Sequence, residues 1–251
     1  MKLIPLAASM ALATSLLLVL SSCGSDSSPN SSSNSNGETP KAVDSPAVAI
    51  YTKTDHGIPW NSAVAYGTFA DPRDSQVYRT VKVGTQTWMA ENLNLAGAGA
   101  CYGNSPDSCS KYGRLYTWAE VMQGAISSTS SPSKVKGLCP AGWHVPSNAE
   151  WTLLGNAVGA SDSAKGTKFK SVGGWANSGN GADVYGFRAL PAGYRAADGS
   201  FTSAAQIAYW WSATESDTSS AWYRNMYFSS ANLSRFYGTK TFWFSLRCAQ
   251  D

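Results

Sequence analysis

The stretch GLCPAGWHVPSNAEW, residues 137–151, brings together residue types that could form a nucleophilic site. His144 and Glu150 could act as base and acid beside the thiol of Cys139. The same stretch also has a structural interpretation, because Ser147 and Glu150 have the S-x-x-E spacing of a capping box. In that case the Glu150 carboxylate binds the backbone at the start of a helix, and His144 is a packed, hydrogen-bonded side chain. We favour the structural interpretation.

Other catalytic motifs are missing from the sequence, which contains no G-x-S-x-G, no H-E-x-x-H and no P-loop. A pair of carboxylates could serve a glycosidase. However, the chain has 16 acidic residues, and any such sequence offers carboxylate pairs. We therefore expect a protein that is not an enzyme and that needs no cofactor.

The chain has 5 cysteines, of which Cys23 belongs to the N-terminal segment. The other four are Cys101, Cys109, Cys139 and Cys248, and an even number in an exported chain predicts two disulfides. Four cysteines allow three connectivities. Cys101 and Cys109 can close a small loop, in which case Cys139 would pair with Cys248 and stabilise the fold by about 4–5 kcal/mol. The absence of C-x-x-C and the scarcity of histidine argue against zinc.

The N-terminus has the pattern of a secretory signal. Lys2 gives a basic start, Leu3–Leu20 is almost wholly apolar, and two serines precede Cys23. This order resembles the lipobox of bacterial lipoproteins, so we expect residues 1–22 to be a signal peptide and Cys23 to be lipidated. The alternative is an uncleaved transmembrane anchor, because the apolar run is about long enough to cross a bilayer.

We expect residues 23–70 to comprise the lipidated cysteine and a flexible tether, because the segment after Cys23 is rich in Ser and Asn. The lipid would hold the protein on a membrane, and Gly24 in place of Asp favours the outer membrane. Residues 71–251 would then form one domain of ordinary size. The net charge of +3 is too weak and too dispersed to indicate a nucleic-acid partner.

Periodicity in the domain predicts both helices and strands. Alternation over residues 77–89, with Gly84 near the centre, predicts a β-hairpin. Apolar residues at helical spacing predict one short helix over Leu115–Met122 and another that begins after Ser147 and buries Trp151. Further strands are predicted over residues 185–190, 222–228 and 242–248.

Six ordered segments resemble the Fibrobacter succinogenes major paralogous domain family. They are TVKVGTQTWMAENLN, CYGNSPDSCSKYGRLYTWAEVM, GLCPAGWHVPSNAEW, YGFRALPAGYR, WWSATE and FSLRC. The family is similar to proteins of the C-type-lectin-like fold, which include the formylglycine-generating enzymes. The resemblance implies an α+β fold with two short helices, a small twisted antiparallel sheet, long loops, and the disulfides Cys101–Cys109 and Cys139–Cys248. It does not support formylglycine chemistry, which needs two neighbouring cysteines in the later part of the domain, where this chain has only Cys248.

These features favour a surface-anchored, non-catalytic binding or adhesion module. Aromatic side chains stack on sugars and anchor interfaces, so we expect a polysaccharide or glycan ligand first and a surface protein second. A structural envelope component is the alternative. Most of the 10 tryptophans should be core residues, with about three exposed. The candidate ligand-binding residues are Trp175, Tyr194, Tyr209, Trp210, Trp211 and Trp222.

A calcium site has little support. The Glu-Pro-Asn, Gln-Pro-Asp and Trp-Asn-Asp sequences of sugar-binding C-type lectins are absent. Asn177, Asn180 and Asp183 place oxygen atoms in one loop, and calcium binds several such oxygens. Because most polar loops are simply solvated, we expect no metal and keep these three residues as weak candidates.

Overall fold

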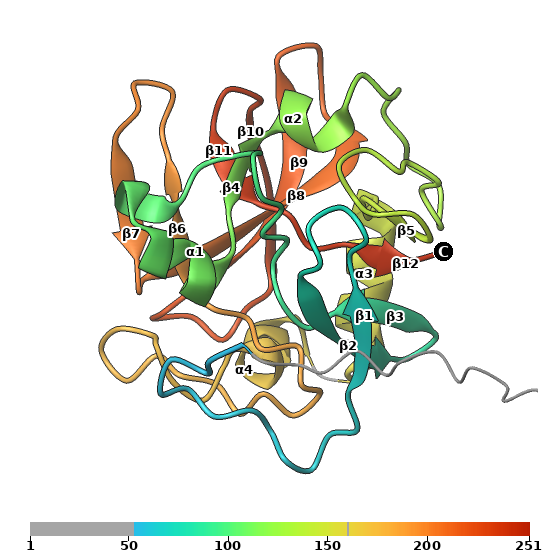
Figure 1. Ribbon diagram of the computed structural model, residues 1–251. Helices are drawn as coiled ribbons and strands as arrows, with labels where there is room; N and C mark the ends of the chain where they lie inside the picture. The colour runs from blue at the N-terminus through green and yellow to red at the C-terminus, as the bar shows by residue number, and fades with distance from the viewer. Residues whose placement is uncertain (1–52, 160) are drawn as a thin grey trace, which may run out of the picture. The chain divides into compact units, whose positions relative to one another are not determined.

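The computed structural model describes residues 53–159 and 161–251, and this part of the chain is built mainly from β-strands (Figure 1). One sheet has five strands in the order β1-β2-β3-β12-β5, and every neighbouring pair is antiparallel. Its strands are β1 (Gly67–Ala70), β2 (Val77–Val83), β3 (Gln86–Met89), β5 (Trp143–His144) and β12 (Ala249–Gln250).

The second sheet has seven strands, of which six follow the order β10-β9-β8-β11-β6-β7 while β4 pairs with β11 beside that path. All its pairs are antiparallel except β8 with β11. Strand β10 lies at an edge of this sheet. The strands are β4 (Leu115–Thr117), β6 (Ala192–Arg195), β7 (Phe201–Ala204), β8 (Ile207–Glu215), β9 (Ser220–Tyr227), β10 (Ser234–Thr239) and β11 (Trp243–Ser245).

The predicted fold class is wrong. We expected a C-type-lectin-like α+β domain with two short helices and a small twisted sheet, whereas the described chain has two large sheets and four short α-helices. The helices are α1 (Pro106–Tyr112), α2 (Trp118–Met122), α3 (Asn148–Ala157) and α4 (Lys165–Phe169), with 3₁₀ turns η1 (Tyr102–Asn104) and η2 (Asp162–Ala164).

Two hydrophobic clusters form the core, and β8 supplies both. Trp211 lies in one cluster with Phe244, while Trp210 lies in the other with Trp151. Successive side chains of a strand point to opposite faces, so β8 is covered on both faces. A strand buried on both faces has no apolar–polar alternation. The sequence IAYWWSATE of β8 accordingly shows no alternation, and the size of the sheet cannot be predicted from it.

The predicted hairpin is confirmed, because β2 and β3 pair in the register Val81 opposite Trp88 and Thr80 opposite Met89. Gly84 has a φ of +61°, which an L-residue rarely adopts, and thereby allows the turn. Both faces of this hairpin are also used: Val81 lies in the cluster with Trp210 and Tyr78 in the cluster with Trp211.

The helix predicted over residues 115–122 is half strand. Leu115–Thr117 form β4, and α2 begins only at Trp118 behind a capping box of Thr117 and Glu120. The spacing T-x-x-E marks this start in the sequence as S-x-x-E marks the next. No strand is found over residues 185–190, where the backbone makes only an isolated bridge at Ala189.

Helix α3 forms as predicted. The Ser147 hydroxyl accepts from the Glu150 amide at 3.2 Å, and the Glu150 carboxylate accepts from the Ser147 amide at 2.9 Å. The helix buries Trp151 and Leu154 in the second cluster. The helix also contacts β9, and its residues line the site described below.

The ordered sheet extends N-terminal to residue 71, where we expected the domain to begin. Strand β1 pairs with β2, and the Arg188 guanidinium donates to the carbonyls of Asp55 and Ile58. Cys23, which we expected to be lipidated, lies outside the described residues. None of the helices in the described ranges is both long and apolar enough to cross a membrane.

Candidate functional site

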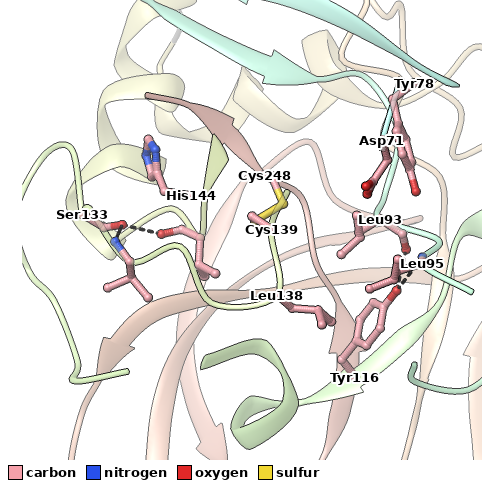
Figure 2. The surroundings of a disulfide bond; sticks show 12 residues. Asp71, Tyr78, Leu93, Leu95, Tyr116, Ser133, Leu138, Cys139, His144 and Cys248 are labelled. Atoms are coloured by element: carbon pink, nitrogen blue, oxygen red, sulfur yellow. Dashed lines mark hydrogen bonds between the residues drawn. A yellow bond between two sulfur atoms is a disulfide. The ribbon is translucent and has the colours of Figure 1, made fainter. Parts of the chain in front are cut away.

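Both predicted disulfides are present. Cys101 bonds to Cys109, and Cys139 bonds to Cys248 with their Cα atoms 6.0 Å apart. Figure 2 shows the second disulfide among packed side chains, with His144 on the neighbouring segment and its ring directed away from the sulfur atoms. Because the sulfur of Cys139 is bonded to that of Cys248, Cys139 is not a nucleophile beside His144.

His144 is instead a buried hydrogen-bonding residue, as we expected. One ring nitrogen lies 2.7 Å from a Glu150 oxygen and the other 2.8 Å from an Asp251 oxygen. Burial lowers the pKa of His144, but the bonds to Glu150 and then Asp251 outweigh it, and the net pKa is raised. The other Glu150 oxygen accepts from the amides of Ser133 and Ser147. Both oxygens of the Glu150 carboxylate therefore accept hydrogen bonds that join neighbouring segments of the chain.

Three of the six predicted ligand-binding residues are buried, and their prediction is wrong. Trp210 and Trp211 are both 0% exposed because β8 is covered on both faces. Trp175 is 5% exposed, and its indole nitrogen donates to the Ala189 carbonyl at 3.1 Å. A ring enclosed in the core cannot stack on a sugar.

Tyr194 and Tyr209 are partly buried and pack against the first cluster. Tyr209 stacks on Phe244 with ring centroids 4.7 Å apart, and Tyr194 meets Tyr209 edge-on at 5.2 Å. Burial raises the pKa of Tyr209. These rings belong to the edge of the core.

The three weak metal candidates are not grouped as ligands. Asp183 is buried, its carboxylate accepts from the Arg188 amide at 2.7 Å, and burial raises its pKa to about 7. The Asn180 side-chain oxygen accepts from the Trp175 amide at 3.1 Å, and Asn177 is exposed. Over the residues that the structure describes, no group of three or more His, Cys, Asp or Glu side chains could hold a metal ion.

Trp222, the remaining candidate, is partly exposed on β9 and leads to a site that we did not predict. In the β9–β10 pairing it lies opposite Tyr237, and the two rings meet edge-on at 5.4 Å. Tyr237 is 61% exposed. Two positions along, Arg224 lies opposite Arg235 on the same face. We call these four residues the hairpin face; β9 and β10 are labelled in Figure 1.

A cavity of about 450 Å³ adjoins the hairpin face, and we call it the hairpin cavity. It lies where α3 and the start of α4 meet β9 and β10. None of the described side chains that line it is acidic. The lining residues are Trp151, Thr152, Gly155, Asn156, Lys165, Arg224, Asn232, Leu233, Ser234 and Arg235.

Arg224 is held at the wall of this cavity by α3. Its Nη2 donates to the Asn148 carbonyl at 3.0 Å, to the Asn148 side-chain oxygen at 2.9 Å and to the Thr152 hydroxyl at 2.7 Å. Its buried Nε has no hydrogen-bond partner. Burial, and then the neighbouring charge of Arg235, lower the pKa of Arg224 to about 10.

Arg235 completes the cation pair from the exposed side. Its guanidinium carbon lies 4.6 Å from the ring centroid of Trp222, a cation–π geometry. Lys165 also lines the cavity and donates to the Asn156 side-chain oxygen at 3.0 Å. The site therefore combines aromatic rings, hydrogen-bond donors and positive charge.

The loop that joins β9 to β10 is held by Lys170. Its ammonium is buried and donates to the carbonyls of Tyr227, Ser230 and Gly179. Burial lowers the pKa of Lys170 to about 8. This bonding fixes the connection between the two strands and so helps to set the register that places Arg224 opposite Arg235.

The sequence carries a signal for this site that we did not use in predicting it. Residues 222–224 read W-Y-R and residues 235–237 read R-F-Y, so the two segments mirror each other. In an antiparallel hairpin such a mirror sets aromatic opposite aromatic and arginine opposite arginine. We predicted the strand over residues 222–228 but did not pair it with the segment that follows.

Another buried arginine, Arg247, joins distant segments of the core by hydrogen bonds. Its Nε and Nη2 donate to the Asn92 side-chain oxygen at 3.1 and 2.8 Å, and its Nη1 donates to the Phe187 carbonyl. The same Asn92 oxygen accepts from the Trp210 indole at 2.8 Å. These residues come from the segments AENLN, YGFRAL, WWSATE and FSLRC, so the segments that looked distinctive in the sequence meet in one buried network.

This two-sheet domain, with its buried network and two disulfides, can be placed in a family. Residues 81–250 match the Fibrobacter succinogenes major domain (Fib_succ_major), and the chain belongs to this family. The resemblance noted in the sequence is thereby confirmed, whereas the lectin-like fold inferred from it is not. No curated protein and no solved structure was found to match the chain.

Proposed function

We propose that the chain is a non-catalytic binding or adhesion module of the bacterial surface and that its ligand is a glycan. The hairpin face is the observation that supports this most directly, because Trp222 and Tyr237 lie in ring contact next to a cavity lined by donors. Aromatic faces beside a few polar groups are typical of sites that bind small ligands by stacking and hydrogen bonding.

The anchor is part of the same proposal. The N-terminal sequence supports lipidation of Cys23 and a location at the outer membrane, which would present the domain to extracellular ligands. Radiolabelled palmitate should enter the wild-type chain and fail to enter a Cys23→Ala variant. Labelling of that variant would contradict the anchor and leave the binding site to be tested separately.

Binding is tested with a panel of polysaccharides against the full chain with both disulfides formed. Tyr237→Ala and Trp222→Ala should each weaken glycan binding by about tenfold, the equivalent of about 1.4 kcal/mol. Phe236→Ala is the matched control, because Phe236 is the neighbouring residue, is 53% exposed and points to the opposite face of β10. Equal losses in Phe236→Ala and Tyr237→Ala would contradict a site on the hairpin face.

The alternative is a protein-binding or structural envelope component. Phe236 supports it, because an exposed aromatic residue on the edge strand β10 could meet a strand of another protein. The same variants separate the two functions. A chain that binds no glycan, but loses a surface-protein partner when Phe236 is replaced, would favour this alternative.

A further inference from the structure

The register of β9 and β10 places two like charges directly opposite each other. Arg224 and Arg235 are Cα partners, and side chains at such positions lie about 5 Å apart at Cβ. Like charges in this arrangement destabilise a sheet. Arg224 is also 7% exposed, so water screens it poorly.

No described carboxylate offsets this charge. Neither arginine forms an ion pair within the described ranges, and the groups that shift the pKa of Arg224 include Arg235 but no acid. Buried charges in proteins are normally paired. The pair thus carries a cost that a bound anion between the two guanidinium groups would relieve.

Buried donors without acceptors lie at the same wall. The Arg224 Nε and the Trp151 indole nitrogen both lack a hydrogen-bond partner, and both residues line the hairpin cavity. Unsatisfied buried donors are rare in folded proteins. Their presence beside a cavity without described acidic lining favours an occupant that accepts hydrogen bonds.

A glycine in the helix that lines the cavity adds to the open space. Gly155 lies within α3, where glycine is about 1 kcal/mol less favourable than alanine. A Cβ atom at this position would lie 3.4 Å from the Lys165 side chain and 3.6 Å from that of Leu233, which is ordinary contact distance. An alanine would therefore fit at this position. With glycine there instead, the space that a methyl group would fill is part of the cavity.

We infer that the hairpin cavity binds the oxyanion of an acidic sugar, a uronate carboxylate or a sulfate ester, between Arg224 and Arg235. The inference rests on the proposed glycan-binding function and adds a charge requirement to it. Guanidinium groups bind the oxygens of planar carboxylates and of tetrahedral oxyanions by paired hydrogen bonds. Trp222 and Tyr237 lie two positions along the same hairpin face, where the exposed ring of Tyr237 would contact the rest of the sugar.

The test compares an oligogalacturonate with the same oligosaccharide after reduction of its carboxyl groups, by calorimetry on the full chain. The acidic form should bind at least about tenfold more tightly, because one charge-assisted hydrogen bond contributes about that factor. Arg235→Gln should abolish the preference. Lys82→Gln removes the same charge from an exposed residue outside the cavity and should leave the preference intact. A sulfated oligosaccharide with its desulfated form distinguishes sulfate from carboxylate.

Equal affinity for acidic and neutral forms, with binding still dependent on Tyr237, would overturn this inference and leave the proposed function standing. Equal effects of Arg235→Gln and Lys82→Gln would also overturn it, since the attraction would then be general charge. Arg224→Gln, measured only in a form shown to be folded, should act in the same direction as Arg235→Gln.

A separate measurement covers the case in which no sugar binds and the glycan proposal fails. Thermal unfolding is compared in sodium sulfate and sodium chloride at equal ionic strength. Sulfate stabilises proteins in general, so the comparison is between variants. Wild type and Lys82→Gln should gain more from sulfate than Arg235→Gln does; the same gain in all three would overturn the anion site.

Discussion

Arg247 and Arg224 are both buried arginines without an ion pair to any described carboxylate, yet their surroundings differ. Arg247 is enclosed, with each guanidinium nitrogen donating to Asn92 or to the Phe187 carbonyl. Burial lowers its pKa to about 9, and Glu91 and Asp183 act against that shift. Arg224 has an Nε without a hydrogen-bond partner and lies at a cavity. The neighbouring charge that shifts its pKa is that of another arginine, Arg235.

The difference shows that burial of a charge does not by itself mark a functional residue. A buried guanidinium with a complete set of acceptors fixes the positions of the strands around it. A buried guanidinium with an incomplete set, next to open volume, leaves hydrogen-bonding capacity for a ligand. The enclosed region around Arg247 thus has a structural role in this chain, whereas Arg224 keeps hydrogen-bonding capacity beside the hairpin cavity.

The largest expected effect concerns the disulfide next to Arg247. Cys139 and Cys248 are 109 residues apart, so replacing both by alanine should lower the unfolding free energy by about 5 kcal/mol in the chain-entropy model. Replacing Cys101 and Cys109, 8 residues apart, should cost only about 2.5 kcal/mol. Guanidinium denaturation measures both. Equal costs would show that loop length does not govern the stability of the enclosed region.

A smaller effect compares the two arginines directly. Arg247→Met leaves the Phe187 carbonyl without its donor and removes two charged donors from Asn92, so it should cost about 3 kcal/mol. Arg224→Met removes hydrogen bonds but also an uncompensated buried charge, so the change in unfolding free energy should stay within about 1 kcal/mol. Urea denaturation of the two variants decides this. Similar losses of unfolding free energy would mean that Arg224 stabilises the fold as much as Arg247 does, which would contradict the difference drawn between the two arginines.

The smallest effect is the pH dependence due to His144. The pKa of His144 is higher in the folded chain than in the unfolded chain, where the imidazole has its ordinary pKa of 6.5. The resulting stability is complete below pH 6.5 and is lost as the pH rises through the raised pKa. Unfolding free energies of wild type and His144→Gln, measured from pH 5.5 to 9, should therefore converge with rising pH. A constant difference would show that the His144 pairs do not depend on its charge.

Short-range features were predictable from the sequence. The hairpin over residues 77–89 and the capping box of Ser147 and Glu150 each depend on residues close together in the chain. Cys101 and Cys109 are close enough in sequence to pair, and that pairing leaves Cys139 and Cys248 to bond to each other. Family membership followed from six ordered segments, and it did not bring the correct fold with it.

The tertiary structure alone decided which side chains are available to a ligand. Trp210 and Trp211 read as surface candidates, but β8 lies between two hydrophobic clusters and buries both. Arg247 contacts Asn92 across 155 residues of sequence, and no local pattern contains that pairing. Tyr237 and Arg235 became candidates once β10 was seen to pair with β9. Local hydrogen bonds and turn geometry fix neighbours along the chain, whereas burial depends on which distant segments cover each face of a strand.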